Sequence, residues 1–96
     1  MSAQASNLNW FEPPREFHYK CTLGEVSVPD RVQATIEFGV RIIYALVPTN
    51  KVDKNKSTLL VQLIGESDEN YLVDIPGEVE NAGTTVRVAK ALFGGT

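Results

Sequence analysis

The sequence predicts an all-β domain, a small and mostly antiparallel barrel or sandwich of about five strands. Short apolar runs alternate with polar residues at a period of two, and turns rich in glycine, proline, asparagine and aspartate separate them. A chain of 96 residues has room for one modest core. We therefore expect one β domain over residues 17–93, preceded by an extended arm, residues 1–16, and followed by a flexible tail, residues 94–96.

The arm is small and polar up to Asn9 and then reads Trp10-Phe11-Glu12-Pro13-Pro14. Two consecutive prolines disfavour a helix and favour an extended, polyproline-like backbone. Two interpretations of Trp10 and Phe11 are open. The rings either cap the core or dock on a partner, because aromatic anchors on short extended segments are common at interfaces.

A first strand is predicted over residues 17–23, where apolar and polar residues alternate up to Gly24. This pattern places Cys21 on the buried face. His18 then lies on the opposite face, because an odd separation in a strand puts two side chains on opposite sides.

The stretch from Val32 to Val47 is the longest apolar run and predicts a half-buried strand. Seven of its sixteen residues are β-branched, so a helix would lose on the order of 5 kcal/mol of propensity relative to alanine. A straight strand of this length spans about 50 Å, against about 30 Å for the domain, so we expect it to bend near Gly39. The alternative is an α+β domain with residues 30–47 helical, because apolar residues also recur at helical spacing. On the strand interpretation the buried side chains lie at the even positions, Val32, Ala34, Ile36, Phe38, Val40, Ile42, Tyr44 and Leu46.

The second half predicts shorter elements. Residues 48–57 form a polar loop that we expect to be mobile. Residues 58–65 alternate two apolar faces and predict a central strand covered on both sides, which pairs in a hairpin with residues 71–75. Residues 84–88 predict a last strand, and residues 89–93 one helical turn.

The formal charge of −3 is concentrated in the second half, where residues 58–96 carry two basic and six acidic side chains. Nucleic-acid binders normally present a basic face, so this balance argues against that class. The single cysteine excludes an internal disulfide, and no stretch resembles a signal peptide or a membrane span. We expect a cytoplasmic protein that does not contact the membrane.

Catalytic and metal-binding patterns are absent from the sequence. The one histidine has no neighbours at metal-ligand spacing, and His18 and Cys21 are predicted to be out of reach of each other. The carboxylates fit neither a calcium loop nor a fixed catalytic pair, and no glycine-rich phosphate loop occurs. We therefore predict that the protein is not an enzyme and holds no cofactor or metal.

The function predicted by elimination is a non-enzymatic protein-binding module or assembly subunit. It would use the aromatic arm, an edge strand and the acidic surface to bind another protein or a second copy of itself. The predicted partner-binding residues are Trp10, Phe11, Glu66, Asp68, Glu69, Glu78 and Glu80. The alternative is a small-barrel nucleic-acid-binding protein. Its predicted contacts are Lys51, Lys54, Lys56 and Arg41.

Overall fold

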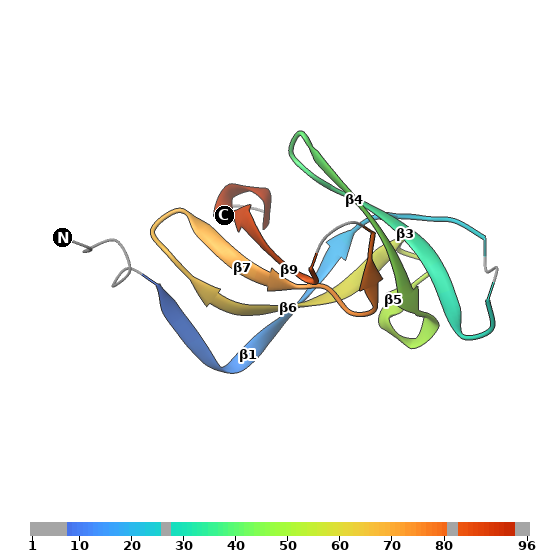
Figure 1. Ribbon diagram of the computed structural model, residues 1–96, viewed down its shortest axis with the longest axis horizontal. Coiled ribbons are helices and arrows are strands. Elements are labelled where there is room, and N and C mark those ends of the chain that lie inside the picture. The colour runs from blue at the N-terminus through green and yellow to red at the C-terminus, as the bar shows by residue number, and fades with distance from the viewer. Residues whose placement is uncertain (1–7, 26–27, 81–82, 94–96) are drawn as a thin grey trace.

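The computed structural model describes residues 8–25, 28–80 and 83–93, which form two antiparallel sheets in a sandwich-like arrangement (Figure 1). Sheet A has the order β1-β6-β7-β9, with β5 also paired to β6, and sheet B has the order β2-β3-β4-β8. The strands of sheet A are β1 (Asn9–Lys20), β5 (Val52–Asp53), β6 (Thr58–Glu66), β7 (Asn70–Asp74) and β9 (Thr85–Ala89). The strands of sheet B are β2 (Thr22–Leu23), β3 (Arg31–Phe38), β4 (Arg41–Pro48) and β8 (Glu78–Val79).

The predicted all-β, antiparallel class is confirmed, as a sandwich and not a closed barrel. The described residues contain two short 3-10 helices, η2 (Thr49–Lys51) and η3 (Lys90–Phe93), and no α-helix. The helical alternative for residues 30–47 is wrong, because this stretch contains β3 and β4. Its high content of β-branched residues outweighs its partial helical spacing.

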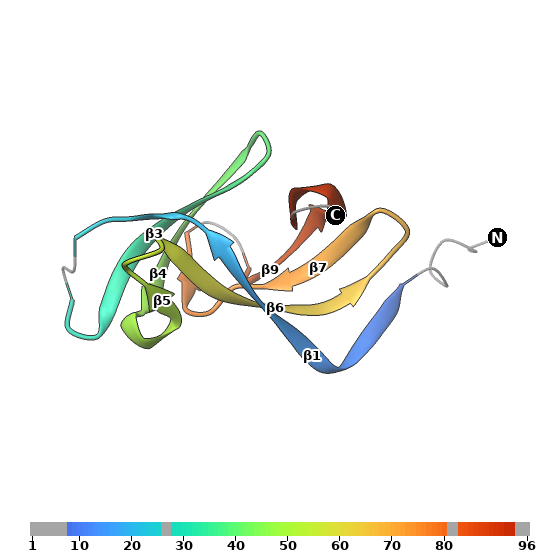
Figure 2. The same ribbon diagram turned by 180° about the vertical axis from the view of Figure 1, so that it is seen from behind.

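The long apolar stretch is a hairpin and not one bent strand (Figure 2). Phe38 pairs with Arg41, so the loop contains only Gly39 and Val40. Gly39 has a φ of 68°, and glycine at the first position of a two-residue loop is typical of a type II′ hairpin turn. The chain reversal explains how sixteen residues fit a domain expected to be about 30 Å across, since each strand of the hairpin has eight residues.

The turn also exchanges the faces of the second arm. Even-numbered residues of β3 are buried as predicted, but in β4 the buried residues are Ile43, Ala45 and Val47. The predicted burial of Val40, Ile42 and Tyr44 is therefore wrong. Cross-strand partners lie on the same face of a sheet, and the register pairs each even residue of β3 with an odd residue of β4.

Strand β1 includes the second part of the predicted arm. Asn9 and Trp10 pair with Glu66 and Gly65 of β6, and pairing resumes at Arg15 after an irregularity that contains both prolines. Proline has no backbone N–H for a ladder, so the interruption at this position follows from the sequence. Residues 1–7 of the arm and the predicted tail, residues 94–96, lie outside the described residues.

Strand β6 is central to sheet A, as predicted, because it pairs with β1, β5 and β7. The predicted hairpin of β6 and β7 is confirmed. The predicted loop at residues 48–57 contains η2 and β5. Its turn is held by Asp53, whose Oδ1 accepts hydrogen bonds from the backbone N–H groups of Asn55 and Lys56 at 3.0 and 3.2 Å.

The core lies between the two sheets and is entirely apolar among the described residues. Each long strand contributes alternate side chains, as expected for sheets with one buried face. The largest fully buried side chains are Ile36, Leu59, Ile75, Val32, Val47, Val61 and Val73.

Candidate functional site

The outer face of sheet B carries an apolar stripe along β4. Ile42 is 49% exposed, Tyr44 is 45% exposed, and Leu46 is half-buried. Val40, in the turn at the end of the stripe, is fully exposed. We call Ile42, Tyr44 and Leu46 the β4 stripe. Scattered exposed apolar residues are normal, whereas a continuous row of them on one strand is typical of an interaction surface.

Carboxylates border the β4 stripe on both sides. On the β3 side, Glu37 pairs in register with Ile42. On the β8 side, Glu78 pairs with Leu46, and the backbone N–H of Glu80 donates a 3.0 Å hydrogen bond to the carbonyl oxygen of Tyr44. We call the exposed residues Glu37, Glu78 and Glu80 the acidic rim.

The acidic rim has no cationic partner in the described part of the chain. The ion pair found there joins Lys90 Nζ to Glu66 Oε1 at 2.9 Å, in sheet A. Arg41 belongs to the odd positions of β4 and so lies on the opposite face from Ile42. Arg31 pairs with Pro48, at the end of the hairpin far from the turn. The three rim carboxylates thus form no ion pair within the described ranges, and Lys20 is a cation near Glu37, since the two residues line one hollow.

A shallow hollow of about 270 Å³ lies between the β4 stripe and β8. Gly77 brings β8 close to β4, with a φ of 95°. A Cβ at this position would lie 2.9 Å from the Cα of Val47 and would overlap the carbonyl of Leu46, so the approach requires glycine. The hollow is lined by Gln33, Tyr44, Ala45, Leu46, Glu78, Val79 and Glu80.

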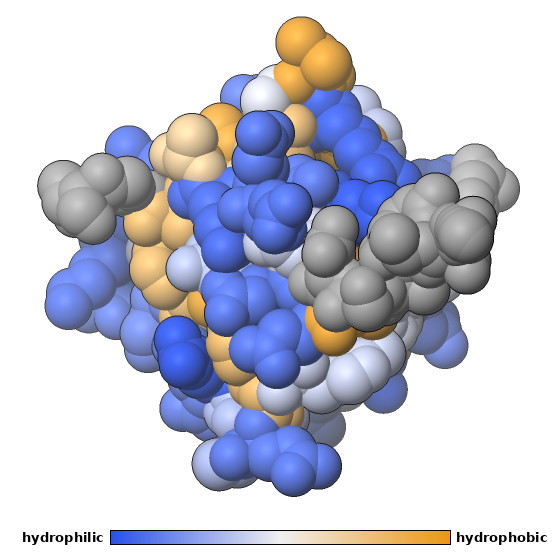
Figure 3. Space-filling model, turned by 90° about the vertical axis from the view of Figure 1, so that its left-hand side faces the viewer, coloured by the Kyte–Doolittle hydropathy of each residue, from blue (hydrophilic) through white to orange (hydrophobic). Residues whose placement is uncertain are grey.

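One end of the molecule is mostly polar. Figure 3 shows the end of the molecule that carries the β6–β7 turn, and most of this end is hydrophilic. An apolar group stands out at the top, at the height of the β3–β4 turn in Figure 1. The fully exposed Val40 lies in this turn.

The predicted aromatic anchors have different environments. Trp10 is 58% exposed on β1, as an anchor requires. Phe11 is buried, its ring centroid lies 6.3 Å from that of Tyr71, and the guanidinium of Arg15 lies 4.1 Å from its centre. Because its ring is packed inside the fold, Phe11 is poorly placed for the predicted docking role, which stays a prediction. The core-capping interpretation holds for this residue.

The predicted acidic surface is divided between the two sheets. Glu66 faces Asn9 across sheet A, beside Trp10, and Asp68 and Glu69 are exposed in the turn that follows. A hydrogen bond from Lys90 holds the pKa of the Glu66 carboxyl below its usual range. The other two predicted carboxylates, Glu78 and Glu80, lie on sheet B. The seven predicted residues therefore do not form one surface.

The residues of the nucleic-acid alternative are also separated. Lys51 lies in η2, and Lys54 and Lys56 are exposed in the turn before β6. Arg41 begins β4 and Lys51 follows its end, so the full strand, about 23 Å from Arg41 to Pro48, separates them. The exposed ring of Trp10 is also distant from these lysines, because Trp10 pairs with Gly65, about 23 Å along β6 from the turn that contains Lys54 and Lys56.

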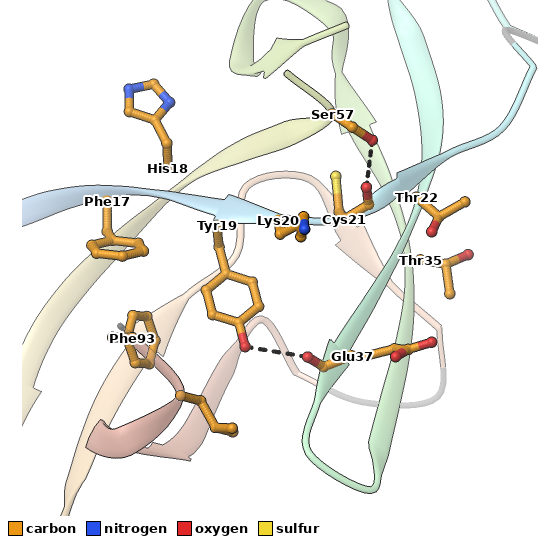
Figure 4. Close-up of a pocket in the computed structure, with 11 residues that line it drawn as sticks. Phe17, His18, Tyr19, Lys20, Cys21, Thr22, Thr35, Glu37, Ser57 and Phe93 are labelled. Carbon is orange, nitrogen blue, oxygen red and sulfur yellow. Dashed lines mark hydrogen bonds between the residues drawn. The ribbon is translucent and has the colours of Figure 1, made fainter. Parts of the chain in front are cut away.

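A second hollow, of about 550 Å³, lies where β1 and β3 diverge (Figure 4). Its aromatic wall is made by Phe17, Tyr19 and Phe93, with the ring of Phe93 5.0 Å from Phe17 and 5.1 Å from Tyr19. The hydroxyl of Tyr19 donates a 3.2 Å hydrogen bond to the carbonyl oxygen of Glu37 and so joins the two sheets. This packing closes the open side of the sandwich.

The reactive groups near this second hollow do not form a pair. Figure 4 shows the ring of His18 directed away from the aromatic wall. Cys21 is free and buried, and burial raises the pKa of its thiol, which disfavours the nucleophilic thiolate. Within the described ranges, no three His, Cys, Asp or Glu residues are grouped as a metal site would require. Those ranges also include no helix long and apolar enough to cross a membrane.

Comparison of the chain with protein-family models, with curated proteins and with solved structures finds no match. Function must therefore be argued from the site. Sequence reasoning missed Ile42 and Tyr44 because it placed the even residues of β4 in the core, and it did not connect Glu37 with them because it did not pair β3 with β4. The signal was present in Gly39-Val40, since glycine followed by another residue between two apolar runs is typical of a two-residue hairpin loop.

Proposed function

We propose that this chain is a non-enzymatic protein-binding module or assembly subunit whose partner surface is the outer face of sheet B. The observation that carries the proposal is the exposed β4 stripe, with Ile42 and Tyr44 each about half exposed beside the fully exposed Val40. Covering such side chains removes apolar area from water at roughly 25 cal/mol per Å². Tyrosine is also enriched at interfaces, because its ring is large and rigid.

The free edges of the sheets do not decide between sheet A and sheet B. Strand β1 is an edge of sheet A, but its two prolines and its exposed charged residues are features that prevent pairing with another chain. In the described residues, β8 pairs with β4 only at Ala45 and Leu46. Strand β9 is the other edge of sheet A, and β2 is the other edge of sheet B. The proposal therefore rests on the β4 stripe and not on an edge strand.

The test is quantitative capture of partners by the immobilised protein, compared with the double variant Ile42→Thr/Tyr44→Thr. Threonine retains β propensity, and both positions are exposed, so the free energy of unfolding should change by less than about 0.5 kcal/mol per site. We expect the double variant to lose partners that the wild type retains.

The control is Trp10→Thr, which removes the exposed ring at the far end of sheet A. This variant should bind as the wild type does. If Trp10→Thr loses the partner and the β4 variant retains it, the partner surface is the aromatic arm and the proposal is wrong.

The nucleic-acid alternative is tested by a gel shift at two salt concentrations. Binding through Lys51, Lys54 and Lys56 would weaken steeply with salt and with neutralisation of these residues. The separation of Arg41 from the lysines reduces the contacts that one strand of nucleic acid could make together. We therefore place protein binding first.

A further inference from the structure

We infer that the segment bound by the outer face of sheet B is an extended chain whose side chains toward the sheet, at every second position, include both apolar ones and lysine or arginine. This inference rests on the proposed function and adds the chemistry of the partner. It combines the spacing of the β4 stripe with the charge of the acidic rim.

The spacing of the stripe favours an extended partner. Ile42, Tyr44 and Leu46 occupy alternate positions of one strand, so neighbouring side chains are about 6.6 Å apart. An extended chain repeats its own side chains on one face at the same interval. Two apolar side chains of such a partner can therefore rest on the stripe in succession.

The negative charge of the acidic rim indicates which other side chains the partner carries beside its apolar ones. Glu37 lies on one side of the stripe, and Glu78 and Glu80 lie on the other. Because side chains i and i+2 of an extended chain share one face, the partner residues that can meet these carboxylates lie two positions away from the apolar ones that cover the stripe. Acidic side chains there would be repelled, whereas lysine or arginine would be attracted and would also accelerate the encounter.

The hollow beside Tyr44 suits a cationic side chain. Tyr44 and Leu46 line it together with both rim glutamates of β8. The methylenes of a lysine or arginine pack on apolar side chains while the charged end meets a carboxylate. The half-exposed ring of Tyr44 adds a surface for cation–π contact.

The experiment titrates the full chain with three short blocked peptides and follows the backbone amides by NMR. In the first peptide two valines and then two lysines occupy every second position, with serine between them, in the second glutamate replaces lysine, and in the third serine replaces valine. We expect the lysine–valine peptide to shift the amides of Ile42, Tyr44 and Glu80. The other two should bind at least fivefold more weakly.

Two double variants with equal loss of charge separate a local effect from a general one. Glu78→Gln/Glu80→Gln should weaken binding of the lysine–valine peptide about fivefold, since two exposed ion pairs are removed. Asp68→Asn/Glu69→Gln removes the same charge at the β6–β7 turn and should leave the affinity unchanged within twofold.

Three results would overturn the inference. The glutamate–valine peptide binds as tightly as the lysine–valine peptide, or the two double variants behave alike, or β4 amides shift with protein concentration alone, which identifies a second copy as the occupant. In each case the proposed function stands as long as binding shifts the backbone amide signals of β4. Peptide-induced shifts confined to residues outside sheet B would contradict both.

Discussion

Replacement of glycine by alanine at three turn positions should destabilise the protein to graded extents, and Gly77 should be the most sensitive. A Cβ added at Gly83 would meet nothing within 4 Å, and this residue has no left-handed φ. Gly39 has a φ of 68° but its Cβ would meet only Leu92 Cδ1, at an ordinary 3.7 Å. Gly77 combines a φ of 95° with overlap of the β4 backbone.

The magnitudes follow from these differences. Gly83→Ala should change the free energy of unfolding by less than about 0.5 kcal/mol. Gly39→Ala should cost about 1 kcal/mol, the lower end of the penalty for a left-handed residue with a Cβ. Gly77→Ala carries the same backbone penalty and also displaces packed backbone, which costs typically 1–3 kcal/mol, so we expect a total of about 3 kcal/mol.

Urea unfolding monitored by circular dichroism measures all three variants on one scale. A domain of this size has a stability of about 5–15 kcal/mol, so a loss of 3 kcal/mol leaves a folded protein in dilute buffer. Because Gly77 positions β8, Gly77→Ala should also weaken any binding that depends on Glu78. Equal stability of Gly77→Ala and Gly83→Ala would refute the reasoning, since both variants add the same methyl group.

Four further predictions address particular side chains. Phe11→Ala should cost about 3 kcal/mol in urea unfolding and Trp10→Ala less than about 0.5 kcal/mol, because one ring is buried and the other exposed; similar losses would contradict the assigned burial. The lowered pKa of Glu66 means that its carboxylate stabilises the fold above its unfolded pKa, and that this contribution is lost as the pH falls through the folded pKa. Glu66→Gln should therefore flatten the acid limb of a stability–pH curve, and an unchanged limb would show that the Lys90 contact is unimportant. Cys21 should react with iodoacetamide much more slowly in buffer than in urea, as measured by mass spectrometry, because it is buried and its thiol pKa is raised. Tyr19→Phe removes the hydrogen bond to Glu37 and should cost about 1 kcal/mol in urea unfolding. An unchanged stability would show that water replaces this bond.

The strands that were predicted well are those with strong local signals. Alternation from Thr58 to Gly65 identified β6, and the turn that follows it identified the hairpin with β7. Residues 84–88 likewise match β9 to within one residue. These patterns depend on side chains near one another in sequence, which is why they can be read without coordinates.

The candidate site could not be read in the same way, because it depends on how strands are paired. The face assigned to every residue after Gly39 depends on whether this glycine lies in a bent strand or in a turn. The predicted continuous strand placed Ile42 in the core and Ile43 on the surface, which is the reverse of the structure. The acidic rim needs two further pairings, of β3 and of β8 with β4. Phe11 shows the same limit, since only long-range packing against Tyr71 makes it a core residue.

The two-residue turn of the hairpin has a consequence for how this surface can vary. A slip of one residue in the pairing of β3 with β4 would move Ile42 and Tyr44 inward and expel Ile43 and Ala45 toward solvent. Changes in the turn should therefore be tolerated only where they preserve this pairing. The proposed binding surface is in this way tied to the fold, since a slip that removed the outer apolar row would also disrupt the core.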